Sequence, residues 1–213
     1  MTGGRAAELL MCKDLVVDLY ERHALAYDRD RSRSLRERAW LDRFLIRVPP
    51  GGTILDVGCG MGEPIARCLI ERAFRVVGVD ASRRMIELCR SRFPDAEWLV
   101  ADMRELDLRR RFDGILAWDS LFHLSADDQR GMFRRFAEHA EPGAPLMFTS
   151  GSAEGESVGV YRGEPLYHAS LPLGSTERCS RTAGSPSGSS PRTTRSAAGT
   201  RFGSQRTTHE STA

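Results

Sequence analysis

The sequence predicts an α/β protein whose doubly wound, mostly parallel sheet has helices on both faces. The first observation is that short apolar runs alternate with segments of helical periodicity five times along the chain. The second is that these runs are apolar throughout, as in parallel strands that are buried on both faces. The third is a glycine-rich turn between the first run and the helix that follows it. This alternation is typical of a parallel sheet covered by helices.

Each element has local signals for its limits. The strands are expected at residues 54–57, 74–80, 96–101, 112–119 and 144–149. The helices are expected at residues 6–22, 34–47, 65–72, 82–92 and 125–139, and a glycine- and serine-rich loop is expected after residue 149. Ser82 and Ser125 are the predicted N-caps of two of these helices. Pro49 to Gly52 separate the second helix from the first strand.

Composition divides the chain into three parts. Residues 1–48 are expected to form an N-terminal helical cap, residues 49–170 the sheet-forming core, and residues 171–213 a low-complexity tail. In the tail, Ser, Thr, Gly, Pro and Arg make up 31 of 43 residues, and Val, Ile, Met, Trp and Tyr do not occur. Such a segment cannot bury enough apolar area to offset the entropy lost on folding, so we expect it to be disordered.

Charge and cysteine content narrow the classes of partner. The chain has 31 basic and 29 acidic side chains, and the tail holds six arginines against two acids. The remainder is therefore slightly acidic, which argues against a nucleic-acid-binding protein. The five cysteines include no C-x-x-C pair, which predicts reduced thiols and no metal site. Without a secretory signal or an apolar stretch of about 18 residues, we expect a cytoplasmic monomer or homodimer with no membrane partner.

The glycine-rich turn is the strongest functional signal. Residues 53–64 have the sequence TILDVGCGMGEP, in which glycines alternate at Gly58, Gly60 and Gly62. Glycine tolerates positive φ and lets a ligand approach the backbone, and the next helix would present free N–H groups. Asp80 ends the second strand, 22 residues after Gly58, where a carboxylate is placed to hold ribose hydroxyls. The pattern therefore predicts a nucleotide-cofactor site at the carboxyl ends of the strands.

The spacing of the glycines distinguishes between cofactors. A dinucleotide fingerprint is G-x-G-x-x-G, whereas this turn is G-x-G-x-G, with Glu63 at the position of the fingerprint's third glycine. An acid at the start of a helix would repel a pyrophosphate and would suit a cationic ligand. The glycine spacing and Glu63 both argue against a nicotinamide dinucleotide. A third acid, Asp102, follows the third strand.

With these motifs, residues 10–170 resemble the Rossmann-like, class I methyltransferases that use S-adenosylmethionine. The turn resembles their first motif, Val79-Asp80 their ribose-binding acid, and Ala101-Asp102-Met103 their adenine pocket. The resemblance implies a small-molecule methyl acceptor. It implies the cofactor-binding residues Asp56, Gly58, Cys59, Gly60, Gly62, Asp80, Ala81, Ser82, Met85, Asp102, Met103 and Trp118.

Catalysis would be methyl transfer by in-line displacement, for which alignment of the two reacting atoms is the main requirement. If the acceptor carries a proton, the candidates for its base are His123 and Asp119, with His23 and Tyr27 as further candidates. Tyr20, Tyr27 and His123 are candidate substrate contacts, because the two tyrosines lie seven residues apart on one predicted helix face. The same tyrosines would also suit packing against the core.

The composition of the tail has a second possible interpretation, in which its reading frame is shifted. Methyltransferases of this kind end with a sixth strand and an antiparallel seventh, and no such pattern follows residue 170. Reading residues 184–205 one base out of frame, with GC-rich codons, gives FAVGFVAADHPERGGHTVWLA, which is a strand, a turn and a strand. We therefore hypothesise a one-base slip near residues 169–176. The alternatives for the chain are a cofactor-binding relic without these strands, or a nicotinamide-dependent oxidoreductase.

The frame slip makes a direct prediction about the gene. Sequencing the source gene should reveal one base gained or lost near codons 169–176, and the natural protein should have the intact mass of the frame-restored chain. A gene that encodes the printed tail in frame would refute the hypothesis.

Overall fold

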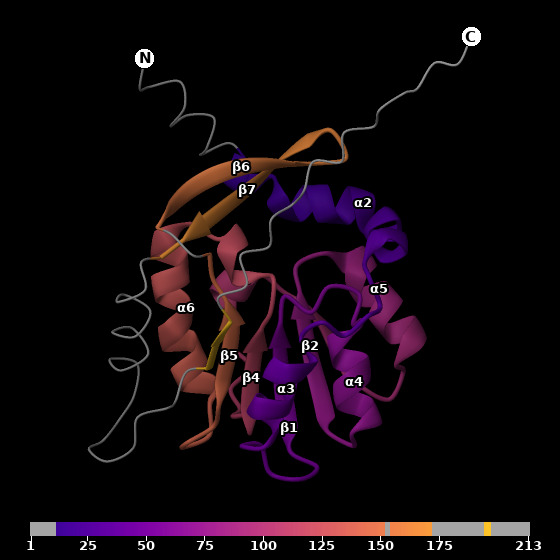
Figure 1. Cartoon of the computed structure of the whole chain (residues 1–213), viewed down its shortest axis with the longest axis vertical. Helices are drawn as coiled ribbons and strands as arrows, with labels where there is room; N and C mark the ends of the chain where they lie inside the picture. The colour runs from indigo at the N-terminus through magenta and orange to yellow at the C-terminus, as the bar shows by residue number, and fades with distance from the viewer. Residues whose placement is uncertain (1–11, 152–153, 172–193, 197–213) are drawn as a thin grey trace.

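The computed structural model describes residues 12–151 and 154–171, and the backbone of residues 194–196 (Figure 1). The strands are β1 (Thr53–Val57), β2 (Arg75–Asp80), β3 (Glu97–Val100), β4 (Gly114–Ala117), β5 (Leu146–Thr149), β6 (Gly155–Tyr161), β7 (Glu164–Ser170) and β8 (Thr194–Ser196). The helices are α2 (Val16–Asp30), α3 (Arg38–Leu45), α4 (Ile65–Glu71), α5 (Arg83–Arg92) and α6 (Ala126–His139). The five predicted strands and the helices between them are thus confirmed.

The main sheet has the strand order β3-β2-β1-β4-β5-β8, and neighbouring strands are parallel. The chain starts at the central strand β1, proceeds outward to β3, and then crosses to β4 and β5 on the other side. This is the predicted doubly wound arrangement, with its switch point between β1 and β4. Val57 lies opposite Val79, so the glycine turn after β1 and Asp80 at the end of β2 are neighbours.

Helices cover both faces of the sheet. On one face α3, α4 and α5 pack on a buried cluster that includes Phe44, Leu69 and Ile86. On the other face α6 packs through Phe133 and Phe136 on a second cluster. Because both faces are covered, the strand residues on either side are buried, which explains the uniformly apolar runs in the sequence. Ser82 and Ser125 cap α5 and α6 by accepting a backbone N–H at 3.2 Å, as predicted.

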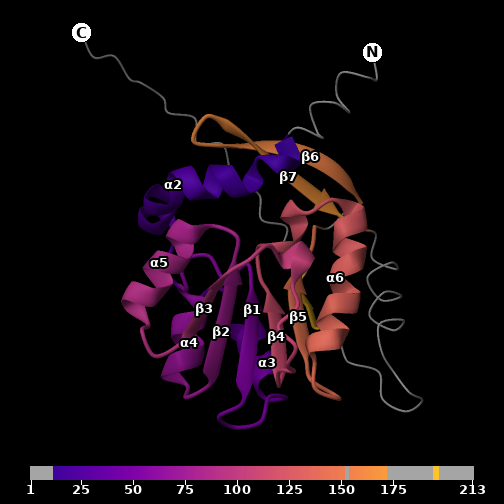
Figure 2. The same cartoon turned by 180° about the vertical axis from the view of Figure 1, so that it is seen from behind.

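A roof crosses the end of the sheet at which the strands terminate. It consists of α2 and the antiparallel hairpin β6–β7, which lie side by side above the sheet in both views (Figures 1 and 2). Leu19 of α2 packs on Tyr167 of β7. Ala24, on the same helix, packs on Met61 of the glycine turn and on Met85 of α5. The roof therefore holds α2 directly over the predicted cofactor turn.

Ionic contacts join the two parts of the roof. His23 Nε2 lies 2.5 Å from Glu164 Oε1, and Arg22 pairs with the same carboxylate. At the far end of α2, Asp30 pairs with Arg162 at 2.6 Å. These side chains are partly exposed, so solvent screens each pair and its contribution to stability is small. Their shared effect is to fix the hairpin to the helix at both ends.

The hairpin was not predicted, because the residues after 149 were expected to form a loop. Its turn contains Arg162 and Gly163 with φ values of +50° and +83°. Positive φ at both central residues is the type I′ geometry that matches the twist of a two-residue hairpin. The signal in the sequence is the alternation from Val158 to Tyr161 on one side of an Arg-Gly pair.

The N-terminal elements differ from their predicted limits. The helix expected at residues 6–22 extends to Asp30 as α2, so both tyrosines and the residues between them are helical. The helix expected at residues 34–47 is shorter, and it packs on a face of the sheet. Residues 12–48 therefore contain a roof helix and a sheet-covering helix.

The predicted tail lies mostly outside the described residues, as does the frame-slip hypothesis. Three tail residues of β8 pair with the outer edge of β5, with Phe148 opposite Arg195. In the part of the chain that the structure describes, no helix has the length and apolar character needed to cross a membrane. The same described ranges contain no cluster of His, Cys, Asp and Glu suited to a metal ion.

Candidate active site

A cleft lies beneath α2 at the carboxyl ends of β1, β2 and β4. Its volume is about 930 Å³, including its open mouth, and a second hollow of about 390 Å³ adjoins it. We call them the wide cleft and the narrow hollow; Tyr27, Gly58, Gly60 and Asp119 border both. The predicted residues at the wide cleft are Tyr20, Tyr27, Gly58, Gly60, Asp80, Ala81, Ser82, Met85, Asp102, Met103, Asp119 and His123. Those at the narrow hollow include Asp56, Cys59, Gly62 and Trp118.

Backbone geometry at the glycine turn explains two of its glycines. Gly58 has φ +74°, and a Cβ there would lie 2.3 Å from Ser120 Cβ, so the close approach of β1 and β4 excludes a side chain. Gly60 has φ +55°, and a Cβ there would meet no atom within 4 Å. Gly60 therefore presents bare backbone to open space. This is the surface that a ligand needs in order to reach the main chain.

Asp80 is held by two backbone donors. Its Oδ2 accepts the Gly60 N–H and its Oδ1 accepts the Ser82 N–H, each at 2.9 Å. One lone pair on each oxygen remains for a ligand. Burial raises the pKa of Asp80, and the two amide hydrogen bonds oppose that rise. The carboxylate is thus fixed between the glycine turn and the start of α5, facing the cleft.

Asp102 and Met103 lie at the other end of the wide cleft, where β3 ends. Asp102 accepts hydrogen bonds from the Arg104 amide at 2.8 Å and from its guanidinium at 2.6 Å. Burial acts to raise the pKa of Asp102, but these hydrogen bonds outweigh it and lower the pKa. Asp102 is therefore an ionised acceptor that already has a cationic partner, which the sequence did not indicate.

Asp56 lies in the narrow hollow, on the central strand. Its side chain is buried, and among the described residues no donor hydrogen bonds to it. Burial, together with the nearby Asp80, raises the pKa of Asp56 to about 7. A buried carboxyl that titrates near neutral pH would favour a cationic ligand that completes its environment.

Tyr20 and His123 form a pair on the inner side of the roof. The Tyr20 hydroxyl lies 3.0 Å from His123 Nε2, and His123 Nδ1 lies 3.0 Å from the Tyr167 carbonyl. A carbonyl only accepts, so Nδ1 carries the proton and Nε2 accepts the Tyr20 O–H. Burial lowers the pKa of His123 to about 4. Both nitrogens are therefore occupied, and Tyr20 and His123 both border the wide cleft.

The other tyrosine and the other histidine lie apart. Tyr27 packs edge-on against Tyr20, with ring centroids 5.4 Å apart, so the predicted shared helix face is confirmed. Both tyrosines border the wide cleft. His23 instead faces Glu164 of the hairpin and borders neither space, so it is poorly placed to act as a base.

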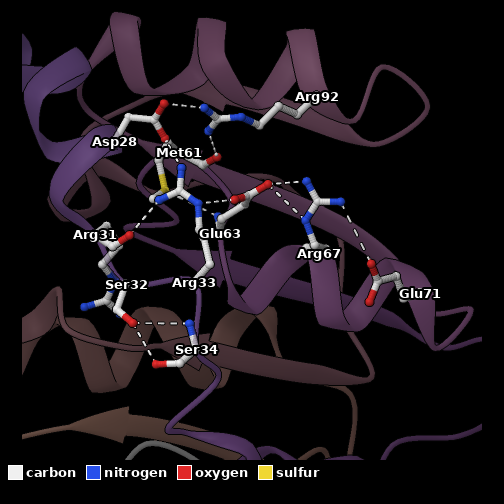
Figure 3. A network of polar contacts seen from close by, with 10 residues as sticks. All are labelled: Asp28, Arg31, Ser32, Arg33, Ser34, Met61, Glu63, Arg67, Glu71 and Arg92. Atoms are coloured by element: carbon white, nitrogen blue, oxygen red, sulfur yellow. Dashed lines mark hydrogen bonds and ion pairs between the residues drawn. The ribbon is translucent and has the colours of Figure 1, made fainter.

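Glu63 does not act as the sequence argument supposed. Its carboxylate pairs with Arg33 and Arg67, within a network that also joins Asp28 and Arg92 (Figure 3). These arginines neutralise Glu63, and its pKa is lowered although burial opposes the change. The charge of Glu63 therefore cannot select a cationic ligand. The glycine spacing remains the argument against a dinucleotide.

Three basic residues that line the site were missed by the sequence analysis. Arg31 borders the narrow hollow, and Lys13 and Arg104 border the wide cleft. Isolated basic residues on a helix or after a strand carry no motif, and only the fold brings them to the site.

The thiols of Cys59 and Cys89 both donate a hydrogen bond to the Gly60 carbonyl, and the Cys89 Sγ lies 3.1 Å from the oxygen. Burial raises the pKa of the Cys59 thiol, so the thiol stays protonated.

Residues 54–143 match the profile of a methyltransferase domain family. The chain therefore contains a methyltransferase domain at these residues. This match agrees with the resemblance to class I methyltransferases seen in the sequence, for which S-adenosylmethionine is the expected cofactor. The alternative of a nicotinamide-dependent oxidoreductase is not favoured.

Two curated relatives methylate amino sugars. The chain is 33% identical over 128 residues to a dTDP-4-amino-2,3,4,6-tetradeoxy-D-glucose N,N-dimethyltransferase from Saccharopolyspora spinosa, covering 59% of this chain and 50% of the relative. It is 30% identical over 132 residues to a dTDP-3-amino-3,4,6-trideoxy-α-D-glucopyranose N,N-dimethyltransferase from Streptomyces venezuelae, covering 61% and 54%. The chain thus spans about half the length of these relatives.

Solved structures show the same fold. An amino pentose methyltransferase from Micromonospora echinaspora matches with a TM-score of 0.59 at 18% identity, covering 76% of this chain and 87% of that one. The methyltransferase DesVI from Streptomyces venezuelae matches with a TM-score of 0.59 at 21% identity, covering 79% and 88%.

The low pKa of His123 predicts an acid-sensitive fold. The unfolded-state pKa of histidine is about 6.5, so below that pH the unfolded chain takes up a proton that the folded chain excludes until about pH 4. Between these values, His123 should lower the free energy of unfolding by up to about 1.4 kcal/mol for each unit of falling pH. Urea titrations at several pH values measure this slope.

The matched variants are His123→Asn and Phe122→Leu. The first should reduce the slope by this amount, whereas the second, which trims the ring beside His123, should keep the slope of the unchanged protein. Equal slopes in all three proteins would show that His123 is not held neutral.

Proposed function

We propose that the protein transfers a methyl group from S-adenosylmethionine to the amine of a small molecule, in the class of nucleotide-linked amino sugars. The observation that carries the proposal is Asp80, fixed by two amides beside the bare backbone of Gly60. The substrates of the two curated relatives support the acceptor class. Because the chain spans about half of each relative, its own activity requires a direct test.

The residues present fit the cofactor from end to end. Asp80 would hold the ribose hydroxyls with its two remaining lone pairs, and Met103 would lie against the adenine beside Asp102. The narrow hollow offers groups for the amino-acid end, namely the Asp56 carboxyl for an ammonium and the Arg31 guanidinium for a carboxylate. When bound, the cofactor supplies a methyl group on a positively charged sulfur.

The acceptor would be aligned by residues on the roof side of the cleft. A neutral amine nitrogen would form the new bond to the methyl carbon while the carbon–sulfur bond breaks to leave S-adenosylhomocysteine, and the proton of the resulting ammonium would pass to Asp119, the candidate base. Asp119 borders both spaces and would attract a cationic amine. The Tyr20 hydroxyl, backed by His123, would orient the acceptor. Since burial lowers the pKa of His123, this pair contributes orientation in preference to proton transfer.

The test is a turnover assay with the chain, methyl-labelled S-adenosylmethionine and a dTDP-linked amino sugar. The expected products are the amino sugar with one or two added methyl groups and S-adenosylhomocysteine, detected by mass spectrometry. A parallel reaction contains a small carboxylic acid, because the chain also matches a trans-aconitate 2-methyltransferase from Azoarcus at 45% identity over 73 residues. The frame-restored chain serves as a second enzyme.

Each contrary outcome has a distinct meaning. Methylation of the carboxylic acid alone would overturn the amine acceptor. Cofactor binding without any methylated product would favour the binding-only relic. Turnover by the frame-restored chain alone would show that catalysis requires the C-terminal strands.

A further inference from the structure

Arg31 lies between two carboxylates at the narrow hollow. Its Nη2 is 3.2 Å from Glu37 Oε1, and its Nη1 is 3.4 Å from Asp119 Oδ2. Charge-assisted hydrogen bonds between arginine and carboxylate are usually about 2.7–2.9 Å. Both contacts are longer than this, and each carboxylate accepts from only one nitrogen of the guanidinium. The guanidinium retains N–H donors for a third partner.

Other arginines near the turn are committed elsewhere. Arg33, Arg67 and Arg92 are paired with Asp28 and Glu63 in the network of Figure 3, on the outer side of the glycine turn. Arg31 is the basic side chain among the described residues that border the narrow hollow. It is therefore the cation that an anionic ligand group in this hollow would meet.

The two carboxylates that flank Arg31 differ in how firmly they are placed. The Glu37 side chain is 10% exposed, and its Oε2 is buried without a hydrogen-bond partner among the described residues. Removing its cationic neighbour would leave a buried carboxylate uncompensated, so Glu37 and Arg31 stabilise each other. The Asp119 side chain is 28% exposed, at the longer distance, on a residue with φ +52°. Asp119 is the looser of the two partners.

We propose that Glu37 is a positioning residue that holds Arg31 toward the narrow hollow, and that the carboxylate of the cofactor replaces Asp119 as the second partner of Arg31. The inference rests on the proposed use of S-adenosylmethionine and deepens it. Glu37 acts through Arg31 and borders neither the wide cleft nor the narrow hollow. The exchange also releases Asp119, which borders both spaces, toward the acceptor side.

The two acids should then have opposite effects on cofactor affinity. The test is isothermal titration calorimetry with S-adenosylhomocysteine and with 5′-methylthioadenosine, which has the adenosine and sulfur but no amino acid. Glu37→Gln should weaken binding of S-adenosylhomocysteine about tenfold or more, the effect of losing a hydrogen bond to a charged group. It should leave the affinity for 5′-methylthioadenosine within about twofold. Asp119→Asn should leave the affinity for S-adenosylhomocysteine unchanged or increase it, because a competing carboxylate is gone.

Glu87→Gln is the matched control, because Glu87 is exposed on α5 and should affect neither ligand. Binding of 5′-methylthioadenosine shows that each variant is folded. Equal weakening of both ligands by Glu37→Gln, or no weakening of either, would overturn the positioning role. A loss of S-adenosylhomocysteine affinity in Asp119→Asn would overturn the exchange. Failure of the unchanged protein to bind either ligand would instead refute the proposed function.

Discussion

The hydrogen bonds from Gly60 and Ser82 to the Asp80 carboxylate are the interaction on which the rest of the site depends. They tie the turn after β1 to the end of β2 and to the first residues of α5. A partly buried carboxylate with two amide donors resists displacement, because losing one would leave a charged group with fewer hydrogen bonds. The glycine turn, the Asp80 carboxylate and the cap of α5 therefore form one rigid unit at the end of the sheet.

The roof, formed by α2 and the β6–β7 hairpin, places side chains over the cleft that the rigid unit does not provide. Glu21 of α2 accepts the Ser82 hydroxyl at 2.6 Å, so the roof helix is anchored to the same corner that Asp80 fixes. From there α2 carries Tyr20 and Tyr27 over the cleft, and Arg31 follows its last turn. In the proposed function, Tyr20 of this roof would orient the acceptor, whereas most of the proposed cofactor contacts follow the strands of the sheet.

Periodicity and strand-end residues were sufficient to predict the sheet and the residues along its carboxyl edge, such as Asp56 and Asp80. Both depend only on neighbouring positions in the sequence and on the rule that parallel strands end at one edge. The β6–β7 hairpin was missed because β6 is mostly exposed and its Arg-Gly turn is a weaker signal than Asn-Gly. The partners of His123, and Arg33 beside Glu63, come from distant segments, so no local pattern could indicate them.

The central claim is that one molecule of S-adenosylmethionine occupies both spaces, with its ribose on Asp80. The most direct measurement is a crystal structure of the protein with S-adenosylhomocysteine. We expect the ribose hydroxyls within hydrogen-bond distance of Asp80, the adenine beside Met103, and the amino-acid end in the narrow hollow below Tyr27. A ligand bound elsewhere, or bound with its ribose away from Asp80, would contradict the account.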